Sequence, residues 1–148
     1  IDYPPLPYCR PKVAAEQRIG QHDGHTILRA TQFHEFLDRI FSTGPVVMVF
    51  GGLEFQVTDG GVVADRMVQL VEAGPQGRVE DIGGPRSESM KRMATTWKKA
   101  SGSRKPTLGI PAVGKAARAF KAKQHHTPHA VAGSPTWDEW LEQRFGSG

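Results

Sequence analysis

The chain has 148 residues, a single cysteine and no long apolar segment. One thiol, Cys9, cannot form an internal disulfide, which argues against a disulfide-stapled scaffold and favours a reducing compartment. No stretch approaches the roughly eighteen apolar residues that a membrane helix needs, and no charged-then-apolar signal segment opens the chain. We therefore expect a cytoplasmic protein with no membrane partner.

Phosphate-binding glycine motifs are missing as well. Neither G-x-G-x-x-G nor G-x-x-G-x-x-G occurs, and the pair Gly60-Gly61 does not precede a lysine at the spacing of a P-loop. Apolar residues make up 38% of the chain and the mean hydropathy is −0.43, toward the polar end for a globular protein. This composition is consistent with a piece that packs against something else.

What the chain does have is a tyrosine four residues before a lysine. If this segment is helical, Tyr8 and Lys12 leave one face of the helix, one turn apart. The ammonium group of Lys12 would favour the phenolate and lower the pKa of Tyr8, which suits a general acid–base catalyst. The same spacing also arises by chance, so the surrounding pattern has to support it.

The pattern after this pair predicts an α/β fold. A helical run to about residue 19, a polar turn at 20–24 and a strand at 26–29 give the rhythm of a parallel sheet. Apolar periodicity and turn signals predict the remaining elements. These are helices at 33–41, 60–73, 90–101 and 113–121, a terminal helix capped by Thr136, and strands at 45–50, 54–58, 77–82 and 106–111.

Five segments, PLPYCRPKVAAE, TILRATQFHEFLDR, DGGVVADRMVQL, GRVEDIGGP and TWDEWL, carry a resemblance to a known family. Together they resemble the NmrA-like atypical short-chain dehydrogenase/reductases, which bind NAD(P). The resemblance implies the C-terminal half of a Rossmann-type parallel-sheet domain with substrate-covering helices. Residues 1–148 would form one partial NAD(P)-binding domain, with the Tyr–Lys helix and the nicotinamide-side strand in 1–44 and the substrate-side region in 45–148.

The resemblance also implies roles for individual residues. In that family the tyrosine is the catalytic acid/base and the lysine holds the nicotinamide ribose, roles that fall here on Tyr8 and Lys12. The residues after the TILR strand lie beside the nicotinamide, and Thr31 and Gln32 are expected to hydrogen-bond its carboxamide. The predicted cofactor-binding residues are therefore Tyr8, Lys12, Ala30, Thr31, Gln32 and Phe33.

One departure from the family concerns the phosphate-binding turn. Family members begin with a strand, a glycine-rich turn and a helix, none of which this sequence contains. The chain opens at Ile1 without a methionine, so we expect a C-terminal half that lacks on the order of a hundred residues, at about thirty or more per βαβ unit. The sheet edge left unpaired would invite a homodimer.

Several side chains allow two interpretations. Phe33 and Phe36 suit either the core or a hydrophobic substrate wall. His34 and Glu35 could face a ligand, but we expect them to be solvated or to cap a helix. A group of three histidines is expected in an exposed loop rather than at a metal, because Pro128 interrupts any helix and no cysteine or acid lies near. The group comprises His125, His126 and His129.

The second half of the chain is basic. Between Arg86 and Lys123 there are eleven lysines and arginines against one acid, Glu88. We interpret them as solvated helix faces, because no nucleic-acid motif or stacking aromatic cluster accompanies them. Three functions stay open: an NAD(P)H-dependent oxidoreductase acting on a small molecule of unknown identity, a non-catalytic dinucleotide-sensing or partner-binding module, and a truncated chain whose basic surface meets nucleic acid.

Overall fold

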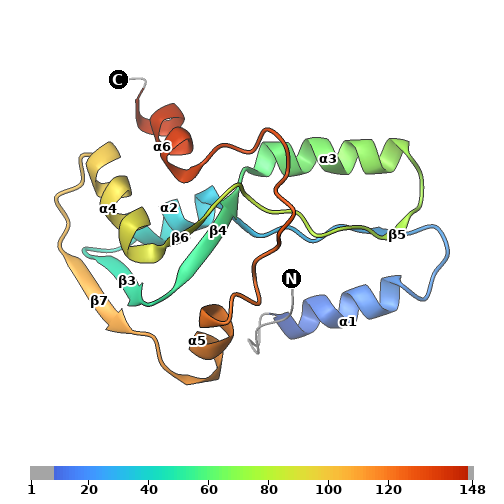
Figure 1. The fold of residues 1–148 in the computed structure, drawn as a ribbon, viewed down its shortest axis with the longest axis horizontal. Helices are drawn as coiled ribbons and strands as arrows, with labels where there is room; N and C mark the ends of the chain where they lie inside the picture. Colours follow the sequence, from blue (N-terminus) through green and yellow to red (C-terminus); the bar gives the residue numbers. More distant parts are fainter. Residues whose placement is uncertain (1–8, 147–148) are drawn as a thin grey trace.

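The computed structural model of the chain describes residues 9–146 and has the predicted α/β fold, with parallel strand pairs and flanking helices (Figure 1). Tyr8 lies outside the described residues. The helices are α1 (Cys9–Ile19), α2 (His34–Ser42), α3 (Gly60–Glu72), α4 (Met90–Ala100), α5 (Gly114–Lys121) and α6 (Trp137–Phe145). The strands are β1 (Thr26–Ile27), β2 (Gln32–Phe33), β3 (Val47–Gly51), β4 (Glu54–Thr58), β5 (Gly77–Arg78), β6 (Ser87–Ser89) and β7 (Thr107–Pro111).

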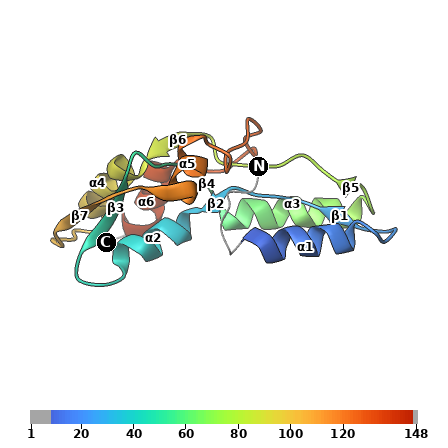
Figure 2. The ribbon, with the colours of Figure 1, turned by 90° about the horizontal axis from the view of Figure 1, so that it is seen from below.

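The first part of the fold is a parallel strand pair with two helices on one face. β1 pairs with β5, and an isolated bridge between Ala30 and Ile82 continues the contact toward the carboxyl end. Figure 2 shows α1 and α3 on the same side of this pair. In the chain, α1 precedes β1 and α3 precedes β5, and each helix runs opposite to the strand that follows it. The amino ends of α1 and α3 therefore lie near the carboxyl ends of these strands.

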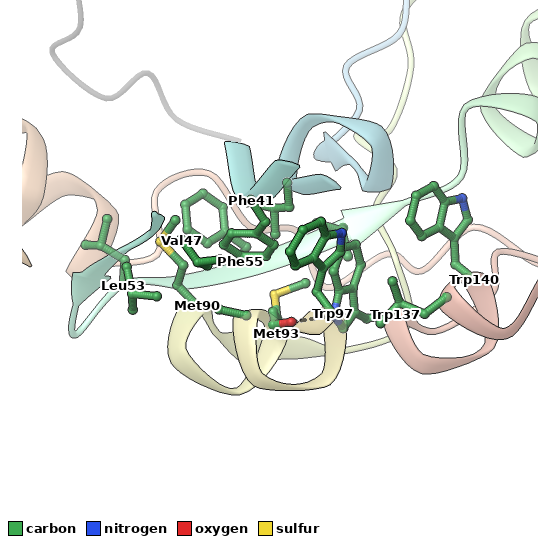
Figure 3. Packing of buried hydrophobic residues seen from close by; sticks show 14 residues of the cluster. Phe41, Val47, Leu53, Phe55, Met90, Met93, Trp97, Trp137 and Trp140 are labelled. Atoms are coloured by element: carbon green, nitrogen blue, oxygen red, sulfur yellow. Dashed lines mark hydrogen bonds between the residues drawn. The ribbon is translucent and has the colours of Figure 1, made fainter. Parts of the chain in front are cut away.

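The second part of the fold contains the hydrophobic core. β3 and β4 lie between α2 and α4, and α6 packs beside α4 (Figures 1 and 3). The core is rich in aromatic and sulfur-containing side chains, with Phe41, Met90, Met93 and Trp137 almost completely buried. Burying each of these side chains stabilises the fold by about 1.5–3 kcal/mol relative to exposure.

Local capping signals set where several helices begin. The carboxylate of Asp59 accepts a hydrogen bond from the Val62 amide, and the Ser89 hydroxyl accepts one from the Arg92 amide. Thr136 and Glu139 form the reciprocal hydrogen bonds of a capping box at the start of α6. The predicted terminal helix is thus confirmed, and it packs on the body of the molecule.

Two strand predictions were wrong in extent. We predicted strands at 26–29 and 77–82, but the ladder is regular only over β1 and β5. Ile27 pairs with Arg78, and Ala30 pairs with Ile82. Between these two contacts, the segment that follows β5 has one residue more than the segment that follows β1. An extra residue of this kind interrupts a ladder and bends the strand.

Two other strands were not predicted. β2 is only two residues long and pairs in parallel with the end of β4. β6 pairs antiparallel with β4, from Glu54 opposite Ser89 to Gln56 opposite Ser87. In the sequence, Ser87 and Ser89 indicate only the N-terminal cap of α4. Their pairing in a strand depends on β4, a segment more than thirty residues away.

The environments predicted for two histidines were also wrong. His34 has no exposed surface, because its ring stacks within 6 Å of the rings of Trp137 and Trp140. His125 is only 5% exposed, because its ring packs on Phe120 and its Nε2 lies 2.8 Å from the carbonyl oxygen of Glu54. His129 is exposed, as predicted.

The described residues contain neither a membrane-spanning helix nor a metal-binding cluster. Within residues 9–146 no helix combines the length and the apolar character needed to cross a bilayer. The same part of the chain contains no cluster of three or more histidine, cysteine or acidic side chains that could hold a metal ion.

Gly83 and Gly84 pass against the carboxyl-terminal part of β4 and leave no room for side chains. A Cβ on Gly84 would lie 1.6 Å from the carbonyl oxygen of Val57. A Cβ on Gly83 would lie 2.8 Å from methyl groups of both Thr31 and Thr127. The GGP turn of the sequence is therefore a close backbone approach.

We predict that Gly84→Ala destabilises the protein by about 3 kcal/mol, because the backbone of β4 cannot move away from the new methyl group. The measurement is the midpoint of urea unfolding. Gly60→Ala is the matched control, since a Cβ at Gly60 meets nothing within 4 Å. Equal midpoints for the two variants would contradict the close approach.

Candidate functional site

A cleft of about 960 Å³ lies between α1 and α3, along β1 and the segment that follows it. Its walls are mainly apolar, and its size lies within the range of small-molecule sites. One end, near the carboxyl end of β1, is more polar and includes Lys12, Thr31 and Gln32. In open α/β sheets, ligands bind at the carboxyl ends of the strands.

The cleft brings together five of the six residues predicted from the sequence. Lys12 comes from the first turns of α1 and reaches the cleft from one side. The other four, Ala30, Thr31, Gln32 and Phe33, line the cleft from the segment between β1 and α2. The sixth residue, Tyr8, lies outside the described residues, so its role stays a prediction.

The segment from Ala30 to Phe33 is fixed by backbone pairing on both sides. The amide of Thr31 donates to the carbonyl oxygen of Ile82 at 3.0 Å. Gln32 and Phe33 then pair in parallel with Val57 and Thr58 of β4. The backbone of this part of the cleft wall is therefore held in place from both sides.

The hydroxyl of Thr31 is a buried polar group with an open hydrogen-bonding capacity. Thr31 is 6% exposed, and within the described part of the chain its Oγ1 has no hydrogen-bond partner. Buried hydroxyls are nearly always paired with protein atoms or ordered water, so this hydroxyl has a hydrogen-bonding capacity that the described side chains leave open.

Phe33 and Phe36 line the cleft beside this polar end. They are 41% and 45% exposed, so the interpretation as core residues is wrong. Their exposure fits the alternative of a hydrophobic substrate wall, which stays a prediction.

An ion pair links α1 to the exit of β1. The Nε of Arg29 lies 3.0 Å from both carboxylate oxygens of Glu16, and both side chains are largely buried. None of the residues of α1 is fully buried, so apolar packing holds this helix only weakly. Glu16 lies one turn after Lys12 on the same helix face, so the pair helps to position Lys12.

Neither this ion pair nor the contacts of Gln56 were predicted from the sequence. The amide nitrogen of Gln56 donates to the carbonyl oxygens of Gly84 and Thr127, and its oxygen accepts from the Thr127 amide. These contacts join segments far apart in the chain. No local spacing pattern could have found them.

No protein-family model matches the chain, and no curated protein matches it. The similarity that the comparisons find is to solved structures. Among solved structures, the chain is similar to a dTDP-glucose 4,6-dehydratase from Bacillus anthracis str. Ames in complex with NAD, with a TM-score of 0.67 and 17% identity. The match covers 97% of this chain and 52% of the dehydratase, so the chain spans about half the length of that protein. At this identity the likeness shows the fold, and the NmrA-like assignment stays a prediction.

We predict that Arg29→Met loosens α1, because the variant keeps the apolar stem but loses the charged hydrogen bonds to Glu16. Amide hydrogen exchange in α1 should accelerate at least about tenfold, as expected for the loss of hydrogen bonds to a charged group. Arg66→Met is the matched control, since Arg66 contacts only Gln69 of its own helix in the described hydrogen bonds. Unchanged exchange in α1 would show that the ion pair does not hold this helix.

The buried histidine predicts a pH dependence of stability. Burial lowers the pKa of His34 from 6.5 to about 4, although the Asp59 carboxylate partly opposes this change. Between pH 6.5 and 4 the unfolded chain takes up a proton that the folded chain excludes, so stability is fully present above pH 6.5 and is lost as the pH falls toward 4.

His34→Phe should therefore reduce the fall in unfolding free energy between pH 6.5 and 4, because the aromatic packing remains and the titrating group is gone. Chemical denaturation across this pH range measures the slope. His22→Phe, at an exposed turn, is the matched control for replacing a histidine by phenylalanine. A His34→Phe slope equal to that of the original chain would refute the assignment.

Proposed function

We propose that this chain supplies the nicotinamide side and the substrate side of an NAD(P)H-dependent oxidoreductase of the short-chain dehydrogenase type. The observation that supports it most is the cleft that gathers Lys12 and Ala30–Phe33 at the carboxyl end of β1. The structurally similar dehydratase is described in complex with NAD, which agrees with a dinucleotide ligand. Within this class, the sequence resemblance favours an NmrA-like member.

The residues of the cleft fit a nicotinamide. The orphaned hydroxyl of Thr31 could either donate to or accept from a carboxamide, and the side-chain amide of Gln32 could do both. Ala30 leaves room beside them for a flat ring. The apolar walls around Phe33 would exclude water from its other face.

Each residue then has a defined task. When bound, NAD(P) would supply the hydride-transfer chemistry. Lys12 would donate hydrogen bonds to the ribose hydroxyls and favour the phenolate of Tyr8. Tyr8 would pass a proton between its phenol oxygen and the substrate oxygen. The sequence has no glycine-rich phosphate turn, so these residues would contact only the nicotinamide and its ribose.

We predict that Lys12→Met weakens NADPH binding at least about tenfold, because a charged hydrogen bond to the ribose is worth about 1.5–3 kcal/mol. Titration followed by nicotinamide fluorescence measures the affinity. Lys91→Met on the exposed face of α4 is the matched control and should bind as the original chain does. Equal affinities of the two variants would refute the assigned site.

Tyr8→Phe separates catalysis from binding. It should leave the NADPH affinity within about threefold, because the ribose and the carboxamide keep their partners, and it should abolish hydride transfer to a panel of carbonyl compounds. Binding by the original chain without transfer to any carbonyl compound would favour the dinucleotide-sensing alternative.

A further inference from the structure

β7 is the outer strand of its sheet and has an open edge. Among residues 9–146 it pairs with β3 alone, in parallel, over five residues from Val47 opposite Thr107 to Gly51 opposite Pro111. Figure 1 shows β7 at the rim of the molecule, with β3 on its inner side. Four residues of β7 are exposed, and Ile110 is half-buried. An exposed strand edge is a template for another strand.

The register shows which backbone groups face outward. In a parallel ladder, every second residue of a strand turns its amide and carbonyl groups toward the neighbouring strand. The carbonyl of Pro106 accepts from the Val47 amide at 2.9 Å, so Leu108 and Ile110 continue the pairing with β3. The amides of Thr107 and Gly109 therefore point to the open side.

Apolar side chains lie beside this edge. Met48 and Leu108 are opposite each other in the ladder and are 37% and 50% exposed. Paired residues of a parallel ladder point to the same face of the sheet, so the two side chains form one small apolar patch. A strand added to β7 could place an apolar side chain next to Leu108.

The surroundings of the edge are basic. Lys98 at the end of α4 places its Nζ 3.4 Å from the Thr107 hydroxyl, and Arg104 and Lys105 lie just before Pro106, which precedes the strand. Lys115 and Lys121 of α5 follow it, and the Nζ of Lys121 lies 3.4 Å from the carbonyl oxygen of Ala112. The nearest acid in the sequence, Glu88, is already paired with Arg92. Positive charge thus flanks both ends of the strand.

We propose that the open edge of β7 binds an extended peptide of a partner protein, with an apolar residue at its centre and acidic residues at its ends. Main-chain hydrogen bonds to Thr107 and Gly109 would supply a general affinity, and the charges and the apolar patch would supply selectivity. This site is independent of the proposed cofactor site, because none of its residues lines the cleft.

Two other occupants fit the edge less well. Single-stranded nucleic acid binds through aromatic side chains on which bases stack, but the exposed large apolar residues near β7 are Met48, Leu108 and Val113, none of them aromatic. A second copy of the chain would bring two basic edges together, and like charges oppose such pairing.

The test uses the 148-residue chain and two capped peptides, DEVTITED and its charge-reversed counterpart KKVTITKK. At about 1 mM peptide, in the range of weak contacts, the acidic peptide should shift the amide resonances of Thr107 and Gly109 and slow their hydrogen exchange. The basic peptide should do neither. Binding should weaken at least about tenfold in 0.5 M salt, since screening removes the contribution of the flanking charges.

Matched variants at one position test the edge itself. Gly109→Pro removes an outward-facing donor and should lower the peptide affinity at least about tenfold, because proline is tolerated at a strand edge but cannot donate. Gly109→Ala should bind within about threefold of the original chain, since a Cβ at this position meets nothing within 4 Å. Circular dichroism confirms that both variants fold.

A double charge reversal provides a second measurement that does not touch the strand. Arg104→Glu with Lys115→Glu should lower the affinity at least about tenfold, and Arg66→Glu on α3 should leave it unchanged. The proposal is overturned if the two peptides bind equally, if the shifts map away from β7, or if the oligonucleotide dT12 shifts the same amides more strongly. A dimer formed through β7 in the absence of peptide would also overturn it.

Discussion

The close approach of Gly83 and Gly84 to β4 is the constraint on which the rest of the structure depends. With no side chains in the way, the backbone after β5 lies against Val57, and the methyl groups of Thr31 and Thr127 close over Gly83. The Ile82 carbonyl then accepts from the Thr31 amide. Four segments that are distant in the sequence meet at this point. The strand pair with α1 and α3 is thereby joined to the aromatic core around β4 (Figures 1 and 3).

The geometry of the candidate site follows from this junction. β2 is only two residues long and could not hold its position by local pairing alone, yet it lies between β4 and the cleft. The side chain of Gln56 ties Gly84 to Thr127 behind it. Thr31 is therefore held with its hydroxyl buried and without a partner in the described part of the chain. A rigid backbone that presents an open hydrogen-bonding group is what a binding site requires.

The aromatic core gives this junction a stable base. Trp97 Nε1 donates to one oxygen of Asp38 at 2.6 Å, and Arg144 Nε donates to the other at 2.9 Å, so α6 is anchored to α2 and α4 by one carboxylate. Trp137 adds a hydrogen bond from its indole to the Met93 carbonyl. Polar groups on large aromatic side chains thus find partners inside the core, as buried tryptophans generally do.

The sequence predicted those features that depend on short spacings. The α/β fold, each helix and the capping box of Thr136 and Glu139 follow from periodicity and end signals within a few residues. Lys12 and Thr31 line the same cleft, because a helix that precedes a parallel strand returns its amino end to the strand's carboxyl end.

The features that the sequence did not predict depend on tertiary contacts. β6 needs β4 as its partner, and the burial of His34 needs α6, whose tryptophans lie a hundred residues further along the chain. His34 looks solvated beside Glu35 in the sequence because nothing local marks it as a core residue. The extra residue that shortens β5 is likewise visible only when the register with β1 is known.

The most direct test of the central claim is nuclear Overhauser spectroscopy of the 148-residue chain with NADPH. We predict cross-peaks between the nicotinamide ring protons and the side chains of Thr31 and Gln32, and between the ribose protons and Lys12. Cross-peaks only to residues outside the cleft would contradict it, because the dinucleotide would then bind elsewhere and the orphaned hydroxyl of Thr31 would need another explanation.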